Sequence, residues 1–163
     1  MPMIANGRSA PDFSLTAVGS KRQVNLQNGA DQILLIFHTY HTARLVGATI
    51  KNLRVTFPDP ERLLVASVPN LSAIPRLLHR LARKILHDAY QEAAQEVPVS
   101  EEAADHIVIL PDWKGTVTKK YQVPKGNNQV TMVLIDQARL IQRTYVGEEP
   151  VGAALSLLNG SGK

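Results

Sequence analysis

The sequence contains no cysteine. This absence excludes disulfide bonds, zinc–thiolate sites and every mechanism that needs a thiolate. Aromatic residues are scarce, with three Phe, four Tyr and one Trp, which leaves few rings for stacking on bases. The net charge of +4, from 18 basic and 14 acidic residues, is a mild excess. The composition therefore predicts no nucleic-acid partner.

The chain also lacks an apolar run of about 18 residues, so no transmembrane helix is predicted. The first eight residues have no basic region followed by an apolar segment, which argues against a secretory signal, and we expect a cytoplasmic location. A length of 163 residues with 44% apolar content suits one globular domain. We expect a single domain over 1–163, with an N-terminal arm over 1–12 and a flexible tail over 159–163.

The stretch around which the chain is organised is the apolar run Ile33–Phe37, which follows Asn28-Gly29. Its length and β-branched residues are typical of a strand buried on both faces. Four polar or ring-bearing residues, His38-Thr39-Tyr40-His41, come next, and helical spacing begins after Thr42, a candidate cap. A central strand that ends in a polar loop opening a helix is where α/β folds usually place their chemistry.

The remaining pattern predicts a mixed sheet. Parallel strands joined by crossover helices come first, and an antiparallel hairpin closes the sheet. The further predicted elements are a hairpin over 13–15 and 23–26, strands over 63–68, 107–110, 130–135 and 140–146, and helices over 117–121 and 150–158.

Residues 72–98 predict an extended amphipathic helix, with Ser72 as its cap and Pro75 in its first turn. One side is apolar, and the opposite side is basic in the first half and acidic in the second. The apolar side comprises Ile74, Leu77, Leu78, Leu81, Ile85, Ala89 and Ala93.

Four segments carry a resemblance to a known family: Ala10-Pro-Asp-Phe-Ser-Leu15, Ile33–Phe37, Leu110–Tyr121, and Thr131–Asp136 with the strand after it. Their order resembles thioredoxin-fold proteins of the peroxiredoxin, or redoxin, branch (the alkyl hydroperoxide reductase/thiol-specific antioxidant family). The resemblance implies an α/β, thioredoxin-like fold of the peroxiredoxin type. Such a fold has a mixed central sheet with helices on both faces, and the extended amphipathic helix is an addition to it.

The reactive loop departs from that family. If Thr42–Leu45 is aligned with the family's T-x-x-C, Leu45 stands at the peroxidatic cysteine. If Tyr40–Arg44 is aligned with W-C-x-x-C, then His41 and Arg44 replace the two thiols. Either alignment removes the sulfur, so we expect no thiol-dependent peroxidase or disulfide reductase activity. The favoured hypothesis is a redox-inactive binding or dimerisation module.

The alternative hypothesis is a redoxin-class oxidoreductase, or a metal- or anion-dependent enzyme, that uses a His38/His41 pocket. Two imidazoles three residues apart can bind a metal or transfer protons, and His106 is the third histidine outside the long helix. Arg44, at the start of the following helix, can bind an anion, although a structural salt bridge is the commoner role. On balance we predict no catalytic residue, no cofactor and no metal.

The long helix predicts the partner. Its basic first half and acidic second half are complementary in an antiparallel pair, which is what a twofold axis imposes. We therefore expect a homodimer to which residues 73–97 contribute, and a protein partner on this helix is a second option. A membrane surface is disfavoured, since a basic helix face is more often simply solvated.

Overall fold

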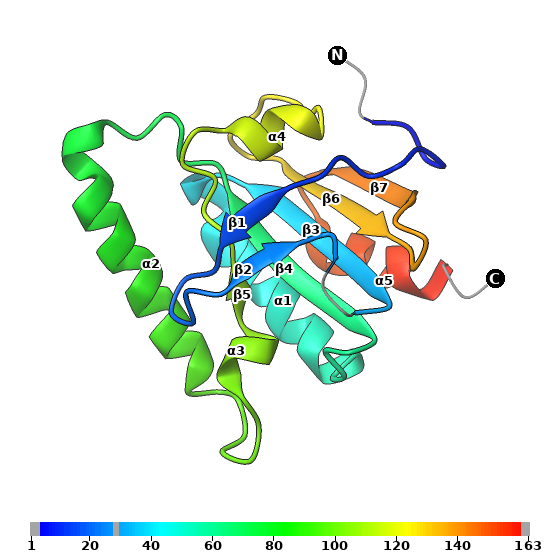
Figure 1. Cartoon of the computed structure of the whole chain (residues 1–163), viewed down its shortest axis with the longest axis horizontal. Helices are drawn as coiled ribbons and strands as arrows, with labels where there is room; N and C mark the ends of the chain where they lie inside the picture. The colour runs from blue at the N-terminus through cyan, green and yellow to red at the C-terminus, as the bar shows by residue number, and fades with distance from the viewer. Residues whose placement is uncertain (1–3, 28–29, 161–163) are drawn as a thin grey trace.

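A computed structural model describes residues 4–27 and 30–160. Its centre is a five-stranded mixed sheet in the order β5-β4-β3-β6-β7 (Figure 1). The predicted central strand is confirmed, because β3 pairs parallel with β4 and antiparallel with β6. The predicted antiparallel hairpin of β6 and β7 is confirmed as well. The strands are β3 (Gln32–His38), β4 (Leu63–Pro69), β5 (Val108–Ile109), β6 (Val130–Ile135) and β7 (Ile141–Gly147).

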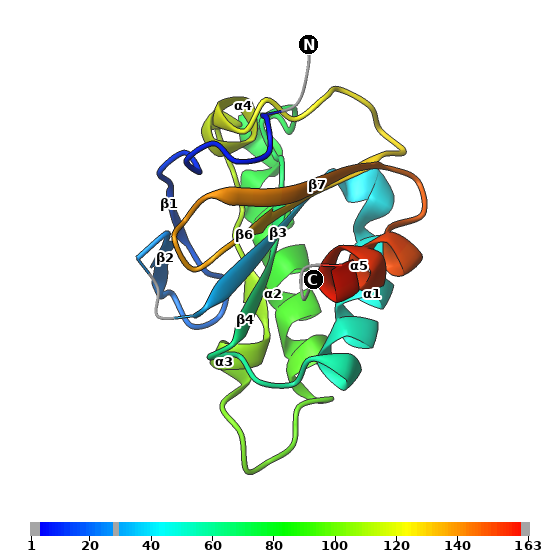
Figure 2. The ribbon, with the colours of Figure 1, turned by 90° about the vertical axis from the view of Figure 1, so that its right-hand side faces the viewer.

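Strand β3 supplies both hydrophobic cores, since successive side chains point to opposite faces of the sheet. Ile33, Leu35 and Phe37 belong to one core, and Leu34 and Ile36 belong to the other. The Leu34 side is covered by α1 (Ala43–Thr56) and α5 (Pro150–Gly160). The Ile33 side is covered by the β1 (Ser14–Thr16)–β2 (Gln23–Asn25) hairpin and by α4 (Thr116–Lys120) (Figure 2). Helices therefore lie on both faces, as predicted.

The turn between β6 and β7 contains a residue other than glycine with a left-handed backbone. Arg139 adopts a left-handed conformation with φ of 64°. Its N–H donates to the Asp136 carbonyl at 2.9 Å, and the Asp136 carboxylate accepts from the Leu140 N–H at 3.0 Å. These hydrogen bonds stabilise a conformation that is costly for a side chain with a Cβ atom.

The long helix begins later than predicted. A short 3₁₀ turn, η2 (Arg76–Leu78), leads into α2 (His79–Ala94), so Ser72 is not its cap. The Ser72 hydroxyl instead donates to Asn70 Oδ1 at 2.8 Å. The physical reason is Pro75, because a proline disfavours helical dihedrals at the residue before it. Pro75 itself is extended, with ψ of 146°.

A second predicted cap is also wrong. Thr42 occupies the N-cap position of α1, but its side chain makes no capping hydrogen bond. Its hydroxyl donates to the Thr39 carbonyl at 3.3 Å, because a 3₁₀ turn, η1 (Tyr40–Thr42), precedes the helix. Thr39 is the residue that caps this turn.

Helix α2 stands to one side of the sheet rather than across a face of it (Figure 1). Tyr90 is its one buried side chain, and it packs beside Gly19 in the β1–β2 turn. Further contacts tie its two ends: Trp113 with His79 and Arg83, and Glu96 with Lys51 and Arg54 of α1. A short helix, α3 (Ala103–His106), which the sequence pattern did not indicate, then leads into β5.

The N-terminal arm runs beside the start of β7, where Ser9 and Leu140 form a bridge. Residues 1–3, 28–29 and 161–163 lie outside the described part. The expected flexible tail is wrong for residues 159 and 160, which still belong to α5. Within residues 4–27 and 30–160, no helix is both long and apolar enough to cross a membrane.

Candidate functional site

The candidate site lies where β3, β4 and the segment after β5 end together. His38 is paired in register with Pro69, and the N–H of Asn70 donates to the His38 carbonyl at 2.8 Å. Asn70 in turn forms a parallel bridge with Asp112. Because the carboxyl ends of parallel strands lie on the same side of a sheet, side chains from three separate segments come together here.

Thr39 organises the loop that follows β3. Its hydroxyl accepts from the His41 N–H at 3.3 Å and donates to the Asn127 carbonyl at 3.3 Å. Its carbonyl accepts from the Thr42 N–H, also at 3.3 Å. One threonine therefore caps the η1 turn and joins it to the loop before β6.

His38 is partly buried, and its Nδ1 lies 2.8 Å from the Thr39 carbonyl. A carbonyl only accepts, so Nδ1 carries the proton and Nε2 is left as an acceptor. Burial lowers the pKa of His38 to about 4 from an ordinary 6.5, and the hydrogen bond to Thr39 opposes only part of this effect. His38 is therefore a neutral imidazole at pH 7.

His41 belongs to the η1 turn that follows β3. It is exposed and stacks on Tyr40 with 4.0 Å between ring centroids. Arg44 is exposed one turn further on, and no acidic side chain of the described part lies within 4.0 Å of it, so the predicted structural salt bridge is not found. Leu45 packs against the core that contains Leu34. The positions aligned with the family's thiols thus hold two solvent-facing side chains and one core leucine.

The three histidines considered as metal ligands are not brought together. His106 precedes β5, whereas His38 ends β3. Because β3, β4 and β5 are parallel, the two histidines lie at opposite ends of the strands. There its Nε2 pairs with a Glu101 carboxylate oxygen at 3.0 Å. Among residues 4–27 and 30–160, no group of three or more His, Asp or Glu side chains could hold a metal ion. The residues present do not fit a metal centre at the end of β3.

The second wall of the site is formed by two loops in close contact. Asn70 Oδ1 accepts from both the N–H and the hydroxyl of Ser72. Gly115 has φ of +72°, and a Cβ atom there would lie 3.2 Å from Ser72 Cβ. Asp112 is buried, and its Oδ2 accepts from the N–H and the hydroxyl of Thr118 at 2.7 and 2.8 Å. Glycine and a buried carboxylate therefore hold the 112–118 segment against the end of β4.

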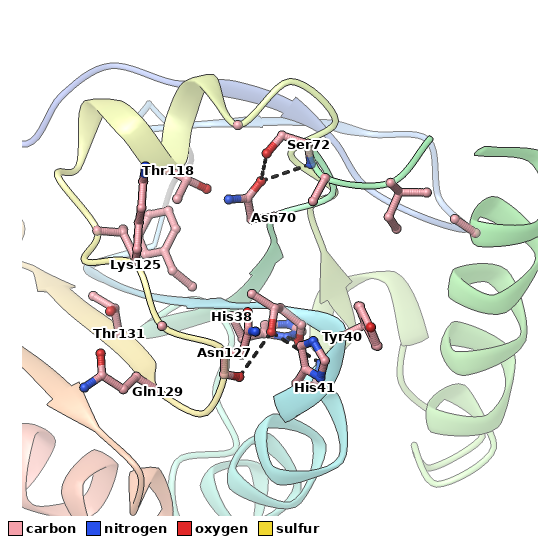
Figure 3. A pocket seen from close by; sticks show the side chains of 18 of the residues that line it. His38, Tyr40, His41, Asn70, Ser72, Thr118, Lys125, Asn127, Gln129 and Thr131 are labelled. Atoms are coloured by element: carbon pink, nitrogen blue, oxygen red, sulfur yellow. Dashed lines mark hydrogen bonds between the residues drawn. The ribbon is translucent and has the colours of Figure 1, made fainter. Parts of the chain in front are cut away.

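These segments enclose a groove of about 940 Å³, which we call the β3-end groove. Figure 3 shows His38, Tyr40 and His41 at one side of it, Asn70 and Ser72 at another, and Lys125 and Asn127 on the loop before β6. The wall formed by the end of η2 and the first half of α2, which we call the α2 wall, is apolar and consists of Leu78, Leu81, Ala82 and Ile85.

The charge of the groove has one sign. Three lysines, Lys114, Lys119 and Lys125, lie along it, and no described Asp or Glu is among its lining residues. The buried carboxylate of Asp112, in the adjoining 112–118 segment, accepts hydrogen bonds from Thr118. The arrangement can hold a ligand that combines apolar groups with negative charge.

Sequence reasoning found His38 and His41 but missed most of the groove. Thr39, Asn70 and Gly115 are the residues that shape it, and their roles depend on contacts between distant loops. A local signal existed for two of them, because Asn-x-Ser after a strand favours a side-chain turn and Gly favours a left-handed bend. The lysines carried no signal, since their convergence depends on where α4 packs.

No protein-family model and no curated protein sequence matches the chain. Solved structures do match over nearly the whole length. The exposed lipoprotein thioredoxin of Streptococcus pneumoniae is 16% identical with a TM-score of 0.63, over 92% of this chain and 99% of that one. The thioredoxin domain of a thiol-disulfide oxidoreductase from Bacteroides vulgatus is 14% identical with a TM-score of 0.59, over 96% and 99%.

A reduced 2-Cys peroxiredoxin from Plasmodium vivax is also similar, at 20% identity and a TM-score of 0.61, over 96% of this chain and 81% of that one. The chain therefore has the thioredoxin-like fold that its motifs predicted. Thiol-disulfide oxidoreductases and a peroxiredoxin both match, so the narrower peroxiredoxin assignment is not singled out. At these identities the likeness concerns the fold alone.

Proposed function

We propose that this chain is a redox-inactive thioredoxin-fold protein that works as a binding module, with the β3-end groove as its binding site. The observation that carries the proposal is the groove itself, which lies beside the loop aligned with the family's reactive thiol in a chain without cysteine. The fold therefore keeps a shaped recognition surface at that end of β3 without the thiol.

The shape of the groove favours a polypeptide segment as ligand. The lining residues of α2 lie at positions i, i+3, i+4 and i+7, which is the spacing of one continuous helix face. At 1.5 Å per residue this apolar wall is about 10 Å long, enough for several side chains of a bound segment. The lysines opposite favour acidic side chains in that segment.

His38 fits a positioning role better than a catalytic one. Its Nδ1 proton is donated to the Thr39 carbonyl, and the exposed His41, which also lines the groove, stacks on Tyr40. A neutral imidazole whose free nitrogen only accepts can bind a ligand N–H without any chemical step. The enzyme alternative gains no support from this geometry.

The test is selection of peptides from a displayed random library on immobilised protein, followed by fluorescence anisotropy with the selected peptides. We expect enrichment of peptides with apolar and acidic residues. Leu78→Ala removes part of the α2 wall and should weaken binding about tenfold, by the loss of a large side-chain contact. Leu140→Ala is the matched control, because Leu140 is a partly exposed leucine outside the groove.

Two results would contradict the proposal. Equal affinities for Leu78→Ala, Leu140→Ala and the unchanged protein would place binding elsewhere. Peroxidase turnover in a coupled assay, if abolished by His41→Ala, would show that the loop retains redox chemistry. We expect turnover at background level, since methionine is oxidised only slowly and without regeneration by the protein.

A further inference from the structure

Charged and apolar residues each recur at every fourth position along α2 and the residues on either side of it. The residues at every fourth position from 76 are all charged, and those at every fourth position from 77 are all apolar. The charged row is Arg76, Arg80, Lys84, Asp88, Glu92 and Glu96. The apolar row is Leu77, Leu81, Ile85, Ala89, Ala93 and Val97.

Much of both rows is exposed to solvent. Every member of the charged row is exposed, and Leu77, Leu81 and Ile85 are 95%, 54% and 59% exposed. Contacts with the body come from Tyr90 and Arg83, and in the charged row from Glu96, which pairs with α1. The first half of the apolar row is therefore an exposed ridge, and two of its members, Leu81 and Ile85, also line the β3-end groove.

The charges are arranged against the needs of an isolated helix. Cations lie in the first half and anions in the second, which opposes the helix dipole. Arg80 and Lys84 are like charges four residues apart, as are Asp88 and Glu92, and such pairs destabilise a helix. Lys84 with Asp88, at 2.9 Å, is the favourable neighbour pair in this row. Glu96 pairs with Lys51 and Arg54 of α1, but no described contact within the monomer accounts for the order of the other charges.

We propose that a second copy of the chain covers this ridge, with the two α2 helices antiparallel about a twofold axis level with residue 86. This inference rests on the proposed function, since it names one partner of the binding module. The axis brings Arg80 beside Glu92 of the other copy and Lys84 beside Asp88 of the other copy. Arg80 and Glu92 are each six residues from the axis, so both pairs form in one register.

The same register fits the apolar ridge. Leu81 of one copy lies level with residue 91 of the other, between the small side chains of Ala89 and Ala93. Large residues occupy the first half of the ridge and alanines the second, so an antiparallel pair places large beside small along its length. Two rows of fourth residues that interdigitate give helices crossing at about −50°, the commonest packing of globular proteins.

The twofold symmetry selects a second copy over another partner. In an antiparallel pair, the charged rows of both helices lie along the same flank, each with its cations opposite the other's anions. A sequence that is antisymmetric in charge about one position is complementary to itself. Arg80 and Glu92 have no ion-pair partner within 4.0 Å in the described chain, so both are available.

The experiment is light scattering of the full chain after size exclusion, at about 1–100 µM, where interfaces of modest quality dissociate. The unchanged protein should approach twice 17.9 kDa at the upper concentrations. Arg80→Glu should raise the dimer dissociation constant about tenfold, because two attractive pairs become repulsive. The double variant R80E/E92R should restore it, since both pairs re-form with reversed sign.

The design separates dissociation from misfolding. Arg80→Glu places an anion between Arg76 and Lys84 and near the helix start, so the monomer should melt at the same or a higher temperature. Val55→Glu, an equally drastic change at an exposed site on α1, should remain dimeric, whereas Leu81→Glu should be monomeric. A monomer mass for the unchanged protein at about 100 µM, or no weakening by Arg80→Glu, would overturn the inference. The Arg80→Glu result can be read apart from peptide binding, because neither Arg80 nor Glu92 lines the β3-end groove, whereas Leu81→Glu changes the groove wall as well.

Discussion

The neutral state of His38 makes the stability of the protein depend on pH in a defined window. In the folded chain burial holds the pKa of His38 at about 4, whereas the ordinary value is 6.5. As the pH falls from about 6.5 to about 4, the unfolded chain binds a proton that the folded chain does not. The free energy of unfolding must therefore fall in this window, and above pH 6.5 His38 contributes no such penalty.

The size of the effect follows from the two pKa values. A displacement from 6.5 to about 4 corresponds to about 3 kcal/mol at full expression. His38 is only partly buried and lies at the edge of the groove, where water weakens the effect. We expect a loss of about 1–3 kcal/mol between pH 7.5 and pH 4.5 that is due to this one ring.

Urea unfolding followed by the fluorescence of Trp113, the single tryptophan, measures this loss. His38→Asn should flatten the difference between the two pH values, because its amide does not titrate. His41→Asn should leave the difference in unfolding free energy between the two pH values unchanged, since His41 is exposed. If His38→Asn and the unchanged protein lost the same stability on acidification, the assignment of His38 as a buried neutral imidazole would be wrong.

Two further variants test how the groove walls are held. Gly19→Ala should cost about 1–2 kcal/mol for its positive φ and, beyond that, displace the Tyr90 ring, which would lie 2.5 Å from the new Cβ. Faster amide exchange in α2 should follow, whereas Gly7→Ala, also at positive φ but with open space around it, should leave α2 unchanged. Asp112→Ala should cost about 1–3 kcal/mol in thermal or urea unfolding, because the two donors of Thr118 lose their acceptor in a buried place. Asp112→Asn should cost less, and equal losses for the two would show that these hydrogen bonds contribute little.

The fold was predictable from the sequence wherever one local signal decided the outcome. Apolar runs identified β3, β4 and β6, and their order fixed which pairs are parallel. The start of α2 was missed because a proline tolerated in a first turn and a proline that delays a helix look alike in sequence. The difference depends on the Asn70–Ser72 hydrogen bond, which engages the expected cap elsewhere.

The candidate site was predictable only in its location. His38 and His41 were recognised because they lie at and just after the end of the central strand, and both line the groove, but His38 is partly buried whereas His41 is exposed. His106 was considered with them, although it precedes a parallel strand and therefore lies at the opposite end of the strands. The lysine side of the groove depends on where α4 packs, and no residue pattern near His38 carries that information.

The order of charges on α2 connects stability with association. Within α2, Arg80 with Lys84 and Asp88 with Glu92 each destabilise the helix by about 0.2–0.5 kcal/mol, and the unfavourable dipole terms add to this. Exposed Leu81 and Ile85 forgo part of the roughly 1.5–3 kcal/mol that burial of each side chain gives. A monomer selected for stability alone would reverse these charges and replace both apolar residues. The sequence instead keeps them on the face that one antiparallel copy would cover, so a variant that stabilises the monomer, such as Arg80→Glu, is expected to weaken the dimer.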